Sequence, residues 1–306
     1  MFDQIGSSIM MPADASRVIS PAGGKTFYVS QLDLHLGSDS NEGTDPEFPL
    51  LTLDVALGKC TQRRHDYIFV QDLYQDDTAP TIVDVRNVHI IGMSEGNQLG
   101  SRAVYDGQGS ACFQVGSTGG SLELAGFRLG SLSSYGIEVT SDAWYNHIHH
   151  NAFGHMIAST TSGIYCPTNY HMQSWMISHN YFSDEMASHA IDVGNATWSH
   201  INHNVFHHGG AGSCIYVRAG PDSGPTIIGN CFAALRSWAE PIGWAIYLIN
   251  CSKGIIMGNY ASETGSSAGN GPYLDLSTAD QDTLTNAWAG NVAADAYANP
   301  GDSGDD

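Results

Sequence analysis

Apolar and polar positions follow a six-residue phrase that recurs seven times along this chain. The phrase reads apolar residue, any residue, Gly or His, usually Asn, any residue, then Phe, Leu or Ala. Its copies span residues 124–129, 148–153, 177–182, 201–206, 227–232, 256–261 and 288–293, so successive copies lie 24 to 32 residues apart. A period of this size is typical of a solenoid.

A second pattern runs in step with the first. A small or aromatic residue precedes an apolar, variable, apolar alternation at residues 136–139, 163–166, 190–193, 214–217, 245–248 and 273–276. Alternation with a period of two indicates a half-buried strand, and no segment between 111 and 293 has a sustained helical period. The sequence therefore predicts an all-β solenoid with two short strands and a turn in each repeat.

The alternation also predicts which side chains face inward. We expect one inward column of isoleucines and one of phenylalanines, at Ile148, Ile177, Ile201, Ile227 and Ile256, and at Phe153, Phe182, Phe206 and Phe232. The recurring Asn would lie at the bend, where a stacked amide can pair with backbone groups that the turn leaves free. The preceding Gly or His fits a residue with positive φ, because Gly has no steric cost there and His is enriched.

This phrase resembles the Asn-ladder turn of right-handed parallel β-helix proteins, the pectate-lyase-like superfamily. The resemblance covers roughly residues 25–293 and implies a right-handed parallel β-helix. It implies little about activity, because that fold hosts lyases, hydrolases, adhesins and virus tailspikes. We divide the chain accordingly into an extended N-terminal arm at 1–24, the β-helix at 25–293 and an acidic flexible tail at 294–306.

The N-terminal third fits the same fold. Residues 25–29, 65–70 and 85–92 are predicted strands, and 37–46 is a turn-rich loop. Apolar spacing over 49–60 predicts a short amphipathic helix that ends near Gly58. The whole run resembles the opening segment of many β-helix proteins, in which a helix caps the first coil. A cap is needed because an open coil exposes apolar side chains and unpaired strand edges.

Composition narrows the possible partners and the compartment. The chain of 306 residues has 11 Lys and Arg against 31 Asp and Glu, a formal charge of −20. Such a surface repels nucleic acid and anionic membranes, so we expect neither as a partner. No secretory signal and no apolar run of about 18 residues is visible. The six cysteines form no CxxC pair, and buried free thiols are expected. No cofactor is implied.

Outward positions of the second pattern offer the candidate chemistry. Glu138 and Asp192 lie two coils apart, roughly 9–10 Å, near the upper end of the carboxyl separation of an inverting glycosidase. Arg218 lies one coil beyond Asp192. Three aromatic residues on the same ladder, Tyr165, Tyr216 and Tyr247, are candidates for glycan binding. The alternative is that all of these are ordinary exposed strand residues.

Histidine forms the other cluster, since 11 of 14 lie between residues 147 and 208. His150, His179 and His203 occupy the turn position on three consecutive coils, where stacked imidazoles could hold a transition metal. A ladder points its rings in parallel, however, whereas a metal site needs converging ligands with supporting contacts. The sequence favours a structural ladder over a metal site.

The function expected from these features is that of a structural virion protein. Pectate-lyase-like enzymes carry clustered carboxylates and a basic catalytic residue, and polygalacturonase-like enzymes carry an Asp-Asp pair and a Gly-His-Gly motif. The repeats of this chain contain neither Asp-Asp nor Gly-His-Gly, and no catalytic residue of either group can be assigned in them. The opening segment resembles phage-encoded β-helix proteins. We expect a capsid decoration, turret or fibre-type protein of a tailed bacteriophage, made in the host cytoplasm and found in the virion. It would form a homotrimer, contact other virion proteins through its arm, and possess affinity for host-surface glycans. The alternatives are a polysaccharide-degrading β-helix enzyme and an extracellular glycan-binding adhesin.

Overall fold

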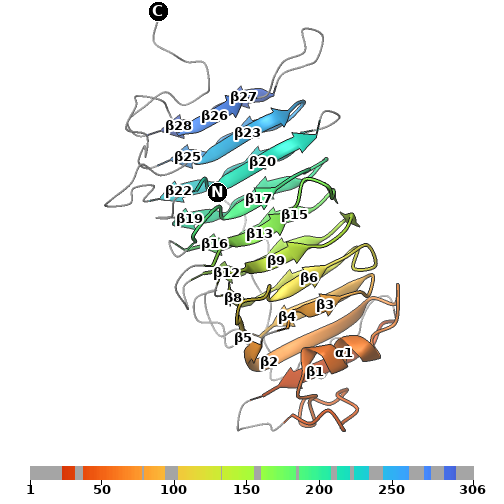
Figure 1. Ribbon diagram of the computed structural model, residues 1–306. Helices are drawn as coiled ribbons and strands as arrows, with labels where there is room; N and C mark the ends of the chain where they lie inside the picture. Colours follow the sequence, from red (N-terminus) through yellow and green to blue (C-terminus); the bar gives the residue numbers. More distant parts are fainter. Residues whose placement is uncertain are drawn as a thin grey trace, which may run out of the picture.

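The computed structural model is an all-β parallel solenoid, built from coils stacked along one axis with α1 beside the first strands (Figure 1). It describes residues 23–31, 37–77, 79–93, 103–131, 133–154, 160–183, 186–207, 212–220, 224–233, 244–261, 272–276 and 286–293. The predicted arm at 1–24 lies outside these residues apart from 23 and 24, and the predicted tail at 294–306 lies outside them entirely.

Three parallel sheets run the length of the solenoid, and every strand pairs with its counterpart on the neighbouring coil. Sheet A contains β1 Thr26–Ser30, β2 Asp66–Asp77, β4 Val88–Gly92, β7 Glu123–Ala125, β11 His147–His149, β15 Met176–Ser178, β18 His200–Asn202, β21 Thr226–Ile228, β24 Ile255–Met257 and β27 Ala287–Ala289. Sheet B shares β2 and continues through β5 Ala103–Gly107, β8 Arg128–Ser131, β12 Ala152–Phe153, β16 Tyr181–Phe182, β19 Val205–His207, β22 Cys231–Ala233, β25 Tyr260–Ala261 and β28 Val292–Ala293.

Sheet C forms the third face, with β3 Thr81–Val83, β6 Phe113–Val115, β9 Tyr135–Val139, β13 Ser162–Cys166, β17 Ile191–Val193, β20 Ile215–Gly220, β23 Ile246–Cys251 and β26 Tyr273–Leu276. A short additional pair joins β10 Ala143–Trp144 to β14 Met172–Gln173. The sequence predicted two strands in each repeat, but the described coils have three. The phrase itself forms an A strand and a B strand on either side of its turn, and the second pattern forms the C strand that follows.

The turn of the phrase has the predicted geometry. Its Gly or His position has positive φ in all seven copies, from 53° to 80°. The Asn that follows is buried from Asn151 to Asn291 and forms a continuous ladder. Asn204, for example, accepts from the Asn180 backbone N–H at 3.0 Å and donates to the Ile177 carbonyl at 2.9 Å. The amide therefore pairs backbone groups that the bend removes from the strand ladder.

The interior is filled by the two predicted columns. The five isoleucines are at most 1% exposed, and the four phenylalanine rings stack parallel with centroids 4.7 to 4.9 Å apart. Burial of each such side chain stabilises the fold by about 1.5–3 kcal/mol. Glycine makes room for the rings, since a Cβ on Gly163 would lie 2.8 Å from Phe182 Cε1. Sequence alternation and ring packing thus agree on one register.

The predicted capping helix is α1, Leu53–Lys59. Thr52 begins it by accepting a hydrogen bond from the Val55 N–H, and Asp39 Oδ1 accepts from the Leu51 and Thr52 N–H groups at 3.0 Å. The helix buries Leu53, Ala56 and Leu57 on the first coil. No helix in the described part of the chain is long and apolar enough to cross a membrane.

One predicted register is wrong. The second pattern aligned Asp275 with Tyr247, but Tyr247 pairs with Leu274 and Leu248 pairs with Asp275. The slip of one residue turns the Tyr273 ring inward, where it is 3% exposed and lies beside Trp288. Burial of the Tyr273 ring in the last described coil of sheet C stabilises the fold more than the aligned apolar positions would, because a tyrosine buries a large area.

Candidate functional site

The outward column of sheet C brings the predicted carboxylates and tyrosines into line. Glu138, Tyr165, Asp192, Tyr216 and Tyr247 pair in sequence across β9, β13, β17, β20 and β23. Tyr165 therefore lies on the strand between the two carboxylates. Glu138 Oε2 accepts a hydrogen bond at 2.8 Å from Gln114 Nε2 on the preceding coil.

Asp192 is not the exposed side chain that the alternation predicted. It is 8% exposed, and its Oδ1 forms an ion pair with Arg218 Nη2 at 2.6 Å. Burial raises the pKa of the Asp192 carboxyl, and Arg218 opposes this rise. Neighbouring side chains enclose the pair, since the Arg218 guanidinium lies 5.3 Å from the Tyr216 ring centre and His189 lies 4.5 Å from the same ring.

The tyrosines of this column stack on other tyrosines. Tyr216 and Tyr247 stack with ring centres 5.0 Å apart, and Tyr165 stacks on Tyr135 with ring centres 4.2 Å apart. The two rings of each pair face each other along the solenoid axis, so no sugar fits between them. A ligand can contact the hydroxyl groups and the ring edges of each pair. Arg218, Asp192 and Tyr216 form a compact polar group there, which fits hydrogen bonding to a polyhydroxyl ligand better than stacking.

The turn histidines form the predicted ladder. His150 and His179 have ring centres 5.2 Å apart, and His179 and His203 have centres 5.4 Å apart, with nearly parallel planes. Burial, followed by the neighbouring His149 and His179, lowers the pKa of His150 to about 4, and burial and the neighbouring His203 also lower the pKa of His179. A neutral state of His150 and His179 at neutral pH fits the structural role that the sequence favoured.

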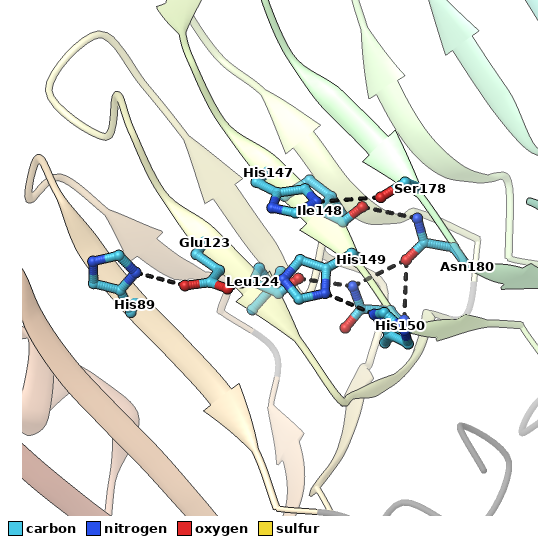
Figure 2. A network of polar contacts seen from close by, with 10 residues as sticks. His89, Glu123, Leu124, His147, Ile148, His149, His150, Ser178 and Asn180 are labelled. Carbon is cyan, nitrogen blue, oxygen red and sulfur yellow. Dashed lines mark hydrogen bonds and ion pairs between the residues drawn. The ribbon is translucent and has the colours of Figure 1, made fainter. Parts of the chain in front are cut away.

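A separate cluster lies on the outer face of sheet A, centred on Glu123 of β7 (Figure 2). Glu123 Oε2 lies 2.6 Å from His89 Nδ1, and Glu123 Oε1 lies 2.9 Å from His149 Nε2. His147 stacks beside His149 with ring centres 4.0 Å apart. His149 Nδ1 in turn lies 2.8 Å from His150 Nδ1, which joins this cluster to the turn ladder.

The electrostatics of this cluster favour an ionised Glu123 carboxylate and a neutral His147 ring. Hydrogen bonds from His149 and then His89 lower the pKa of Glu123 far below its usual range, although burial opposes them. Burial and then His149 lower the pKa of His147 to about 4, and Glu123 opposes this shift. In the described part of the chain, Glu123, His147 and His149 form a group whose potential metal-ligand atoms all lie within 4.8 Å of one another.

The sequence missed the role of Glu123 and His89 for a structural reason. The outward column that pairs His89, Glu123 and His147 steps 34 residues and then 24. Residues 88–92 carry the strand part of the phrase but not its Asn, so the sequence pattern does not align His89 with Glu123. The 24-residue step from Glu123 to His147 does match the repeat, and alignment of the residue that precedes each phrase would have placed Glu123 beside His147.

No family model matches this chain, and neither do any curated proteins or solved structures. What the structure shows is therefore the parallel β-solenoid itself.

Proposed function

We propose that this chain is a structural virion protein of a tailed bacteriophage, a capsid decoration, turret or fibre-type solenoid, with its coil right-handed. The main support for a structural role, as opposed to a catalytic one, is that the contacts of both outward carboxylates restrain them. Asp192 is buried against Arg218, and Glu138 is held by Gln114 with Tyr165 on the strand between the two acids. An acid pair for glycoside cleavage needs both groups free to reach one bond and a water. The phage part rests on the resemblance of residues 16–29, followed by the opening segment with its capping helix, to phage-encoded β-helix proteins.

The exposed sheet faces support assembly as a homotrimer. Late coils carry apolar side chains on the outside, namely Ile255 and Met257 on sheet A and Val205, Tyr260 and Val292 on sheet B, each 39–52% exposed. The net charge of −20 makes acidic parts of the surface repel other copies of the chain. Copies can therefore approach each other most readily through these uncharged apolar side chains. Location in the virion, and contact with other virion proteins through residues 1–24, belong to the same proposal.

Two measurements test it. Mass spectrometry of virus particles from cultures of the encoding strain should detect the chain, and light scattering of the pure protein should give a trimer mass. Ile255→Glu combined with Tyr260→Glu should shift the mass toward the monomer, whereas the exposed Trp198→Glu control should not. A monomeric wild type, or particles that lack the chain, would contradict the proposal.

The second candidate is action on, or binding to, polysaccharide at the sheet C column. The polar group of Arg218, Asp192 and Tyr216 and the paired tyrosines on one face favour it. Release of oligosaccharide from a polysaccharide panel, abolished by Glu138→Gln or Asp192→Asn, would support an enzyme. Binding on a glycan array without turnover, weakened by Tyr165→Ala, Tyr216→Ala or Tyr247→Ala, would support an adhesin found in the virion or outside the cell.

A further inference from the structure

The geometry points to a binding site for one divalent transition-metal ion of the zinc class at Glu123, His147 and His149. The three ligand atoms lie within 4.8 Å of one another and come from two adjacent strands. Parallel pairing sets Glu123 of β7 directly opposite His147 of β11, and His149 is the next outward residue on β11. The backbone therefore holds the three side chains on one face before any ion binds.

Modest side-chain movement would complete the site. Ligand atoms bound to Zn²⁺ at about 2.0–2.2 Å in a tetrahedron lie roughly 3.4 Å apart. Glu123 Oε1 and His149 Nε2 are already 2.9 Å apart, and the His147 ring lies 4.0 Å from the His149 ring. An ion would sit between these atoms and replace the direct contact of Glu123 with His149.

Supporting contacts are also in place, as metal-binding histidines and carboxylates require. His89 Nδ1 contacts the other Glu123 oxygen at 2.6 Å, so that oxygen is held away from the ion position (Figure 2). His149 Nδ1 contacts His150 at 2.8 Å, and His147 Nε2 lies 3.2 Å from Ser178 Oγ. Two of the contacting residues, His89 and Ser178, lie on other strands of sheet A, and the third, His150, lies at the turn. Each contact orients one of the three ligands.

The donor set determines the class of ion. Two imidazoles and one carboxylate suit Zn²⁺ and its first-row neighbours and leave a coordination position open to water. Ca²⁺ and Mg²⁺ prefer an all-oxygen shell, so they should not compete. A bound ion would link the coils of β7 and β11.

Calorimetry on the full chain, stripped with a chelator, tests the site. Zn²⁺ titrated in excess Mg²⁺ should bind with a stoichiometry of one per chain, and Co²⁺ should give the intense visible bands of a four- or five-coordinate ion. His147→Asn removes one ligand, whose ring contacts Ser178 Oγ, and it should weaken binding at least about tenfold. Glu123→Gln should weaken it similarly.

Matched controls separate this site from other histidines and from the acidic surface. His200→Asn changes an exposed histidine in the same outward column, and His203→Asn changes a turn histidine while keeping a residue that tolerates positive φ. Both should bind Zn²⁺ like the wild type. Circular dichroism checks that each variant is folded. Absence of Zn²⁺ binding, full competition by Mg²⁺, or unchanged affinity in folded His147→Asn would overturn the assignment.

Discussion

Asn180 Oδ1 accepts two hydrogen bonds from Asn151 on the preceding coil, one from its backbone N–H at 3.0 Å and one from its side chain at 3.2 Å. Asn180 Nδ2 also donates to the Ile148 carbonyl at 2.9 Å. A single amide therefore satisfies three buried polar groups at the bend. The same arrangement recurs down to Asn291, so each coil depends on the amide of the next.

Replacement of Asn180 by Ala should destabilise the solenoid strongly. It leaves the buried Asn151 N–H and the Ile148 carbonyl without partners, and each unsatisfied group costs about 1–3 kcal/mol. We expect a loss of roughly 3 kcal/mol in the free energy of unfolding, measured by urea denaturation. Asn202→Ala is the control, because Asn202 Oδ1 has no hydrogen-bond partner in the part of the chain that the structure describes, and it should change the value by less than about 0.5 kcal/mol. Equal effects from both variants would contradict the role of the ladder.

Position 179 should distinguish residues by their tolerance of positive φ. His179 has a φ of 56°, which disfavours β-branched side chains. His179→Val should cost about 1–3 kcal/mol, whereas His179→Asn should stay within about 0.5 kcal/mol of the wild type. Thermal and urea unfolding measure both. If Asn were as damaging as Val, ring stacking and not backbone geometry would explain the histidine.

Gly163→Ala should disturb the phenylalanine column. The new Cβ would lie 2.8 Å from Phe182 Cε1 and 2.9 Å from the Ala190 carbonyl oxygen, so a tightly packed ring or the backbone must move. We expect a cost of about 1–3 kcal/mol. The matched change Gly58→Ala, in α1 with no atom within 4 Å of the new Cβ, should be neutral or stabilise by up to about 1 kcal/mol. Denaturation midpoints of the pair check the contrast.

The free energy of unfolding should fall in mildly acidic solution because of His189. Burial, the main cause, lowers the pKa of His189 to about 4; Arg218 adds to this, and the Ser213 backbone opposes it. Ser213 N–H donates to His189 Nδ1 at 2.8 Å, which requires a neutral ring. The unfolded chain titrates near pH 6.5, so it binds the proton first. The stabilising contribution is complete above about pH 6.5 and is lost as the pH falls towards 4.

His189→Gln is the control for that prediction. A glutamine oxygen can accept the Ser213 N–H and does not titrate, so the variant should lose less stability than the wild type between pH 7 and pH 4.5. Urea unfolding at several pH values gives the two slopes. Identical slopes would show that other groups cause the acid sensitivity.

Local rules explain how much of the fold could be predicted. The phrase located the turns correctly because positive φ at Gly126 or His150 and the buried amide of Asn151 are properties of a few adjacent residues. Inward columns followed from the period of two. Prediction failed at β26, where one large ring, Tyr273, fitted the interior only after a slip of one residue.

The candidate sites were less predictable because they join coils. Sequence reasoning placed Asp192 outside, yet Arg218 on the next coil reaches its carboxylate and helps to bury it. It recognised the histidine-rich stretch between residues 147 and 208 but not Glu123, because only the pairing of β7 with β11 places that carboxylate opposite His147.

The sequence by itself determined a parallel β-solenoid, its turn chemistry and its inward columns, because these depend on short-range backbone preferences and on strict alternation. The tertiary structure alone decided which outward side chains meet, such as Glu123 with His89 and His149. Those contacts depend on the register between coils about 4.8 Å apart. That register is set by how the interior rings pack, and no single repeat contains this information.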